Sequence, residues 1–132
     1  MAGGQPAGLT LQDNLIKEAA EEAGVPRQMA LGAIPVGALG YRMAGEWGLK
    51  PDTLFIYDLE VPADFTPRNT DGEISRFYLM EVAEILALLR NTDRFKFNVP
   101  LVLIDFFIRH GFLSPDNEPD YPELVRGLHE GL

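Results

Sequence analysis

Three glutamates near the start of the chain have the spacing of one helix face. Glu18, Glu21 and Glu22 stand at positions i, i+3 and i+4. An α-helix turns by about 100° per residue, so these side chains share one strip of its surface. Like charges at such spacings destabilise a helix by about 0.2–0.5 kcal/mol per pair. Hard divalent cations prefer carboxylate oxygens, so the strip predicts a site for Mg²⁺ or Mn²⁺. A solvated acidic face explains the spacing equally well.

The residues around these glutamates predict the helix that must carry them. Thr10 and Asp13 have the spacing of a capping box, with Asp where Glu or Gln is usual. Gly24 stands where a left-handed C-terminal cap is expected, and Pro26 blocks continuation. We therefore predict a helix within residues 10–25. Its apolar positions fall on one arc: Leu11, Leu15, Ile16, Ala19, Ala20 and Ala23.

This stretch resembles the Nudix box, G-x5-E-x7-R-E-U-x-E-E-x-G-U, in which U is a bulky aliphatic residue. The second half matches in register from Lys17, which replaces the Arg, to Val25. Leu9 stands where the family usually has Glu, and the loop counted from Gly4 is one residue shorter than the pattern. The resemblance implies that Glu18, Glu21 and Glu22 bind the metal, that Glu21 and Glu22 act in catalysis, that Lys17 supports them, and that Gly3, Gly4 and Gly8 shape the preceding loop.

A second acidic group lies at 71–73, where a loop meets a predicted strand. Loops at such junctions often carry functional carboxylates, and Gly72 permits unusual backbone angles. In many Nudix proteins a Glu at the start of a late strand, before an aromatic stretch, binds metal or activates water. Glu73, which precedes Phe77 and Tyr78, resembles that residue. We expect Glu73 to be a catalytic base or a further ligand and Asp71 to support it. The alternative is a turn acid with no catalytic role.

Composition limits the classes of function. The chain has 132 residues, a net charge of −9 and a sequence pI near 4.6. This acidity argues against nonspecific binding to nucleic acid or anionic membranes. It permits an anionic small substrate, because bound cations invert the local field. The sequence has no cysteine, so a thiolate zinc site is excluded. No apolar run reaches the 18 residues of a membrane span, and we expect a cytoplasmic setting.

Interleaved helix and strand patterns predict a single α/β domain over residues 1–132. The resemblance makes this an α/β/α sandwich of the Nudix type with a mixed β-sheet. The box begins at the third residue, so we expect the later part of a longer Nudix protein, without the first strands of the sheet. The predicted elements are a loop with a short strand at 27–36, strands at 37–43, 53–61 and 73–80, a turn at 44–52, and helices at 81–90, 100–110 and 121–131.

A wider resemblance suggests a substrate. The segments 57–62, 71–82, 95–111 and 119–124 are similar to a Nudix subgroup related to the domain fused to thiamine pyrophosphokinase in some fungi, and to plastid Nudix proteins of plants. The resemblance implies hydrolysis of a diphosphate linkage in a small X-linked diphosphate, such as a damaged thiamine diphosphate analogue, to the monophosphate. It also implies a homodimer as one assembly.

Two other functions remain as alternatives. An isopentenyl diphosphate isomerase of this fold uses a catalytic Cys, which the chain lacks. A module that binds a diphosphate without hydrolysing it is consistent with Leu9 and Lys17 at their positions in the box.

Overall fold

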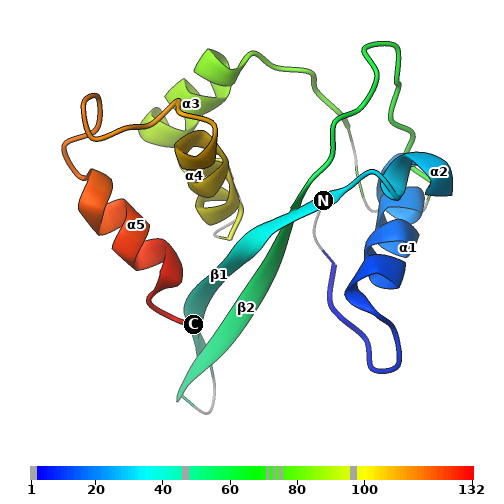
Figure 1. The fold of residues 1–132 in the computed structure, drawn as a ribbon, viewed down its shortest axis with the longest axis horizontal. Coiled ribbons are helices and arrows are strands. Elements are labelled where there is room, and N and C mark those ends of the chain that lie inside the picture. The colour runs from blue at the N-terminus through cyan, green and yellow to red at the C-terminus, as the bar shows by residue number, and fades with distance from the viewer. Residues whose placement is uncertain (1–2, 46–47, 71, 73, 75, 96–97) are drawn as a thin grey trace. The chain divides into compact units, whose positions relative to one another are not determined.

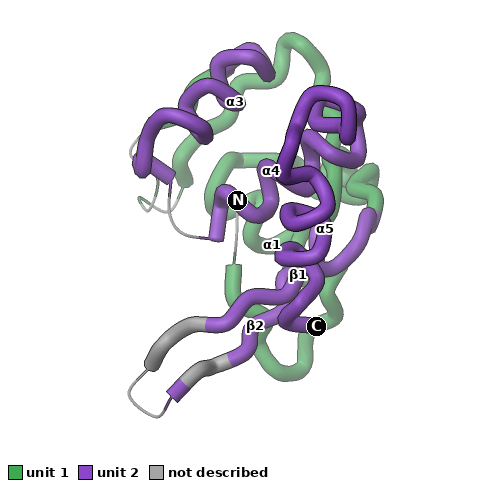
Figure 2. Tube along the Cα trace, turned by 90° about the vertical axis from the view of Figure 1, so that its left-hand side faces the viewer, with its two compact units in different colours: residues 1–34, 57–79 green, residues 35–56, 80–132 purple. Residues whose placement is uncertain are grey.

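The computed structural model describes residues 3–45, 48–70, 72, 74, 76–95 and 98–132, without the side chains of 43–45 and 49–50. Two compact units divide the chain: residues 1–34 with 57–79, and residues 35–56 with 80–132 (Figure 2). Along the described chain, two helices are followed by two strands and then by three helices (Figure 1). The predicted α/β combination of helices and strands is therefore confirmed.

The first unit is built on the helix that carries the acidic strip. Helix α1 spans Leu11–Ala23, as predicted. Thr10 caps its start, because the Thr10 Oγ1 accepts a hydrogen bond from the Asp13 N–H at 3.0 Å. Gly24 ends it in the left-handed conformation, with φ 67° and ψ 26°, and its N–H donates to the carbonyls of Ala19 and Ala20. Both predicted caps are confirmed.

A short second helix, α2 (Arg27–Ala30), packs against α1. The prediction of a loop with a short strand at 27–36 is wrong for these residues. Pro26 is extended and begins the turn, and its carbonyl accepts hydrogen bonds from the N–H groups of Met29 and Ala30. This turn buries Ala30 in the core of the first unit. The core comprises Ile16, Ala19, Ala23, Val25 and Ala30, packed against Met29, Leu59, Phe65 and Phe77.

Strands β1 (Ile34–Gly45) and β2 (Gly48–Asp58) form a two-stranded sheet. The two strands overlap the predicted strands at 37–43 and 53–61, but β2 begins earlier and ends earlier than expected. The prediction of a turn throughout 44–52 is wrong, because residues 44–45 and 48–52 are in the strands. Both strands contribute to the second unit, where Leu39 and Ile56 are buried.

Three helices complete the second unit: α3 (Val82–Asn91), α4 (Val99–Arg109) and α5 (Tyr121–His129). All three match predicted helices within two residues at each end. Leu128 of α5 packs with Leu39 and Ile56, and α4 contacts α5. The partly buried apolar residues around this core are Val36, Leu54, Leu101, Val102, Ile104 and Ile108.

The predicted strand at 73–80 is wrong for the residues described there. Ile74 and residues 76–80 have no strand pairing. Leu79 is fully exposed, and the Ile74 carbonyl accepts a hydrogen bond from the Asn69 side chain. A strand needs a neighbouring strand edge to satisfy its backbone groups. The sheet of the described residues is thus smaller than the expected mixed sheet. None of the described helices has the length and apolar character needed to cross a membrane.

Candidate functional site

The acidic strip on α1 extends from solvent into the first unit. Asn14, Glu18 and Glu22 follow one another at intervals of four residues and form one row on α1. Glu22 is only 7% exposed, whereas the side chain of Glu21 is 45% exposed and that of Glu18 is 21% exposed. Buried carboxylates in proteins are paired or bind metals. A uniformly solvated acidic face therefore does not describe this helix.

Lys17 brings two of the carboxylates together. Its Nζ lies 3.5 Å from the Glu18 Oε1 and 3.7 Å from the Glu21 Oε1. The lysine side chain is half exposed, so each ion pair adds at most about 1 kcal/mol to stability. The geometry shows that both carboxylates can face one positive charge. This donor set suits a hard divalent cation.

The glycine loop lies directly against the carboxylate of Glu18. A Cβ atom on Gly3 would stand 2.6 Å from the Glu18 Cδ and 2.9 Å from its Oε2. The Asn14 Nδ2 donates a hydrogen bond to the Gly4 carbonyl at 2.9 Å. The Gln5 Nε2 donates to the Leu9 carbonyl at 2.6 Å and closes the loop. Glycine at position 3 thus provides space that the carboxylate fills.

The loop before Asp71 is hydrogen-bonded to the C-terminal end of α1. The Thr70 hydroxyl shares its single proton between the carbonyls of Ala20, at 3.1 Å, and Glu21. The Arg68 N–H donates to the Ala23 carbonyl at 2.9 Å. These hydrogen bonds link two segments that are about 50 positions apart in sequence, and the link lies next to Glu21. Asp71 and Glu73 themselves lie outside the described residues, so their predicted roles remain predictions.

The sequence predicted Glu18, Glu21 and Lys17 as neighbours, and the structure brings their charged atoms together. Within the described ranges, no group of three or more His, Asp or Glu side chains is arranged to hold a metal ion. Sequence reasoning missed Asn14 and Thr70. The spacing of Asn14, four residues before Glu18, was a signal that could have identified it. Nothing in the sequence distinguished Thr70, because its partners are distant in the chain.

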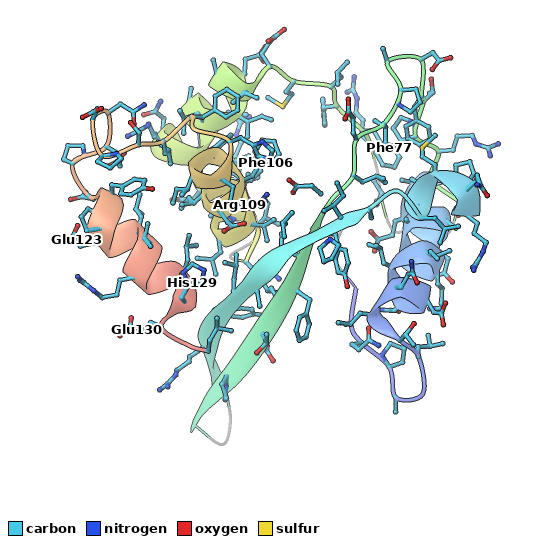
Figure 3. The ribbon with its side chains drawn as sticks, in the orientation of Figure 1. Phe77, Phe106, Arg109, Glu123, His129 and Glu130 are labelled. Carbon is cyan, nitrogen blue, oxygen red and sulfur yellow. The ribbon has the colours of Figure 1, made fainter. Side chains whose placement is uncertain are left out.

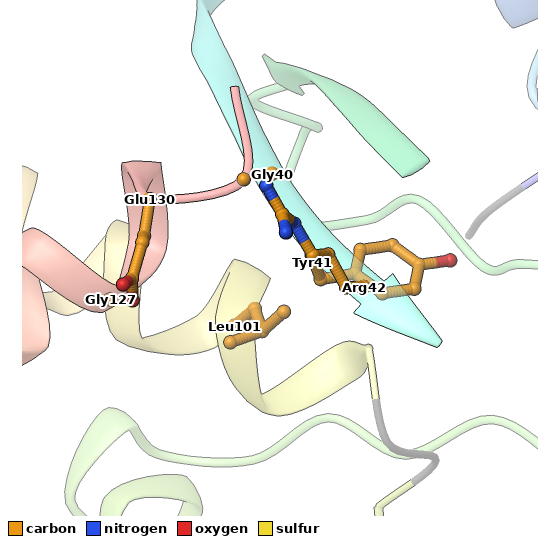
Figure 4. A pocket seen from close by; sticks show the side chains of 7 residues that line it. Gly40, Tyr41, Arg42, Leu101, Gly127 and Glu130 are labelled. Carbon is orange, nitrogen blue, oxygen red and sulfur yellow. The ribbon is translucent and has the colours of Figure 1, made fainter. Parts of the chain in front are cut away.

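A pocket of about 450 Å³ lies in the second unit (Figure 4). Its backbone walls meet where Gly40 approaches Gly131, and a Cβ on Gly40 would stand 2.5 Å from the Gly131 carbonyl carbon. Its charged lining residues are Arg42 and Glu130, and none of the predicted site residues lines it. The pocket is lined by Gly40, Tyr41, Arg42, Leu101, Gly127, Glu130 and Gly131.

Other charged side chains of the second unit form structural pairs. Arg109 Nε donates to the buried Asp105 carboxylate at 2.6 Å, and its guanidinium lies 5.9 Å from the Phe106 ring centre (Figure 3). Arg90 pairs with the buried Glu118 at 2.7 Å. The first pair lies within α4, and the second joins α3 to the segment before α5, so two buried carboxylates are accounted for without a catalytic role.

Comparison with known proteins gives two plant relatives that match nearly the whole chain. The chain is 47% identical over 128 residues to Nudix hydrolase 20, chloroplastic, of Arabidopsis thaliana. It is 44% identical over 131 residues to Nudix hydrolase 24, chloroplastic, of the same plant. Both matches support the resemblance to the Nudix superfamily indicated by the acidic box. No family model matches the chain.

An uncharacterized protein of Saccharomyces cerevisiae is 32% identical over 144 residues and matches 100% of the chain. The chain covers 34% and 36% of the two plant proteins and 42% of the yeast protein, so it spans well under half the length of these relatives. The plant relatives are named chloroplastic, and the expectation of a cytoplasmic setting for this chain stays a prediction.

Proposed function

We propose that this chain takes part in metal-dependent hydrolysis of a diphosphate linkage in a small X-linked diphosphate. The main support for the proposal is that the carboxylates of Glu18 and Glu21 both lie near the Lys17 ammonium group. Glu22 is buried on the same helix. The names of the two plant relatives support the same class of reaction. Their greater length makes the activity and substrate of the whole protein part of this proposal.

Glu18, Glu21 and Glu22 would hold Mg²⁺ or Mn²⁺. When bound, such an ion neutralises phosphate oxygens and favours attack by water on phosphorus. The residues of the chain supply position and charge. The caps at Thr10 and Gly24 fix the ends of α1, and burial restricts the side-chain conformation of Glu22. Glu73, as predicted from the sequence, would take the proton from the attacking water or act as a further ligand.

We extend the proposal to the substrate class implied by the wider sequence resemblance. In this proposal the group X carries a thiamine-like moiety, and the product is the monophosphate. The proposed diphosphate is anionic and the chain has a net charge of −9, so binding depends on cations at the acidic helix. We expect no binding to nucleic acid or anionic membranes, and a homodimer remains a proposed assembly.

The test is to replace single carboxylates by amides of the same shape. Glu21→Gln and Glu22→Gln are assayed with diphosphate substrates, thiamine derivatives included, in the presence of Mg²⁺. We expect each change to lower turnover by more than about 100-fold, because loss of outer partners of a metal ligand alone costs about 10–100-fold. Glu123→Gln on α5 removes the same charge from an exposed position and is the matched control. Full turnover in both α1 variants would refute the proposal.

A diphosphate-binding module without hydrolytic activity is the second candidate. It is favoured by Leu9, which is 38% exposed and offers no carboxylate where the family box has one. Calorimetry with Mg²⁺ and a non-hydrolysable diphosphate, combined with an assay of phosphate release, separates the two. Ligand binding without phosphate release favours the binding module.

A further inference from the structure

Asn14 is a buried polar residue one helical turn before Glu18. It is 6% exposed, and its side chain lies next to that of Glu18 because the two residues are four positions apart. The Nδ2 donates to the Gly4 carbonyl at 2.9 Å. The Oδ1 is buried and has no hydrogen-bond partner among the described residues. The hydrogen bond to the glycine loop is therefore the contact that orients this amide.

That loop contact reaches the carboxylate of Glu18. Gly4 is held by Asn14, and the preceding Gly3 lies so close to Glu18 that a Cβ atom would stand 2.6–2.9 Å from the Cδ, Cγ and Oε2 atoms. On the other side, the Glu18 Oε1 lies 3.5 Å from the Lys17 Nζ. The carboxyl group is thus bounded by the loop backbone and by the lysine.

We infer that Asn14 is a positioning residue for Glu18, acting through the backbone of Gly3 and Gly4. This inference rests on the proposed function, in which Glu18 binds a cation. A glutamate side chain loses rotamer freedom when it becomes a ligand. A loop that restricts the carboxyl group beforehand reduces that loss at the moment of binding.

A purely structural role explains Asn14 less well. A buried amide with an unsatisfied oxygen destabilises the folded state, and an apolar side chain of similar size would avoid that cost. Residues that break a local rule for stability are expected at functional sites. Asn14→Leu should therefore leave the protein folded while it releases the loop from α1.

The first measurement needs no metal. In the free protein we expect a nuclear Overhauser effect between the Gly3 Hα and the Glu18 side-chain protons. Asn14→Leu should abolish this signal. Gln5→Ala is the matched control, because the Gln5 side chain donates to the Leu9 carbonyl of the same loop rather than to a group beside Glu18. The signal should persist in that variant.

The second measurement is the affinity for Mn²⁺ alone, determined from the electron paramagnetic resonance signal of the free ion. We expect Asn14→Leu to weaken binding about tenfold, as for loss of other residues that orient metal ligands. Gly3→Ala displaces the Glu18 carboxylate and should also weaken binding. Because both changes act through one contact, the double variant should bind about as well as the weaker single variant.

Three results would overturn the inference about Asn14 or the proposed function on which it rests. A persistent Gly3–Glu18 signal in Asn14→Leu overturns the inference, as does a lost signal with unchanged Mn²⁺ affinity. Equal Mn²⁺ affinities of Glu18→Gln and the unsubstituted protein overturn the proposed function, and the inference with it. The metal-free signal distinguishes that failure from a failure of the loop contact.

Discussion

At the scale of single residues, Lys17 balances the negative charge of α1. Its ammonium group lies within 4 Å of both Glu18 and Glu21, which would otherwise repel each other. A divalent cation bound by the same carboxylates would compete with this ammonium group. We therefore expect Lys17 to stabilise the free protein and to oppose metal binding, in contrast to the supporting role that the family resemblance implies.

This competition gives a prediction for Lys17→Gln. Removal of the ammonium should raise the affinity for Mn²⁺ by up to about fivefold, corresponding to at most about 1 kcal/mol for exposed ion pairs. Lys17→Arg keeps the charge and should bind Mn²⁺ much as the unsubstituted protein does. Calorimetric titration measures all three proteins. A lower affinity of Lys17→Gln would instead show that the lysine supports the ligands.

Tyr41 gives a prediction for pH dependence. Burial raises the pKa of its hydroxyl above the ordinary value of 10.0, and its hydrogen bond with Asp52 adds to this effect. The folded protein then keeps this proton to higher pH than the unfolded chain does. The free energy of unfolding should therefore fall as pH rises from about 10 through the folded-state pKa.

Urea unfolding at several pH values between about 9 and 11 measures this dependence. Tyr41→Phe removes the titrating group, so this part of the alkaline loss of stability should disappear. An equally steep loss in the variant would contradict the assignment.

At the scale of elements, α1 is held at both ends by residues outside it. Thr10 caps the first turn, and the last turn carries the hydrogen bonds from Thr70 and Arg68. The contacts at the last turn come from groups that are distant in sequence from the helix. The loop that leads to Asp71 and Glu73 is thereby attached beside Glu21.

The attachment predicts the effect of Thr70→Val, which removes the hydroxyl and keeps the shape of the side chain. We expect a loss of about 1 kcal/mol in the free energy of unfolding, since one side-chain donor is removed. We also expect faster amide exchange at Arg68, whose N–H bonds to Ala23 in the same loop contact. Thr70→Ser retains the hydroxyl and should restore both values. Unchanged exchange in Thr70→Val would show that the hydroxyl does not fasten the loop.

At the scale of the whole molecule, the chain has two units with separate cores, and the acidic helix and the pocket lie in different units. The first unit contains the acidic helix and the glycine loop, and the second contains the pocket and the paired charges of α3 and α4 (Figure 2). The chain passes between the units near residues 34, 56 and 79. The residues named in the proposed function belong to the first unit.

The sequence by itself determined what local contacts control. The start and end of α1 were predictable, because the Thr10 cap and the Gly24 turn involve neighbours within five residues. The helices of the second unit were predictable from their apolar periodicity for the same reason. Helical spacing alone also places the carboxylate of Glu21 near Lys17, because the two residues are four positions apart.

Tertiary structure decided the features that depend on distant partners. Glu22 is buried although Glu21, its neighbour in sequence, is only partly buried, because burial is set by what packs on each side of the helix. Residues 76–80 have strand-like composition but no strand pairing in the described structure. The contacts of Asn14 with Gly4 and of Thr70 with Glu21 join segments 10 and 49 residues apart, and a local sequence pattern carries no information about such pairs.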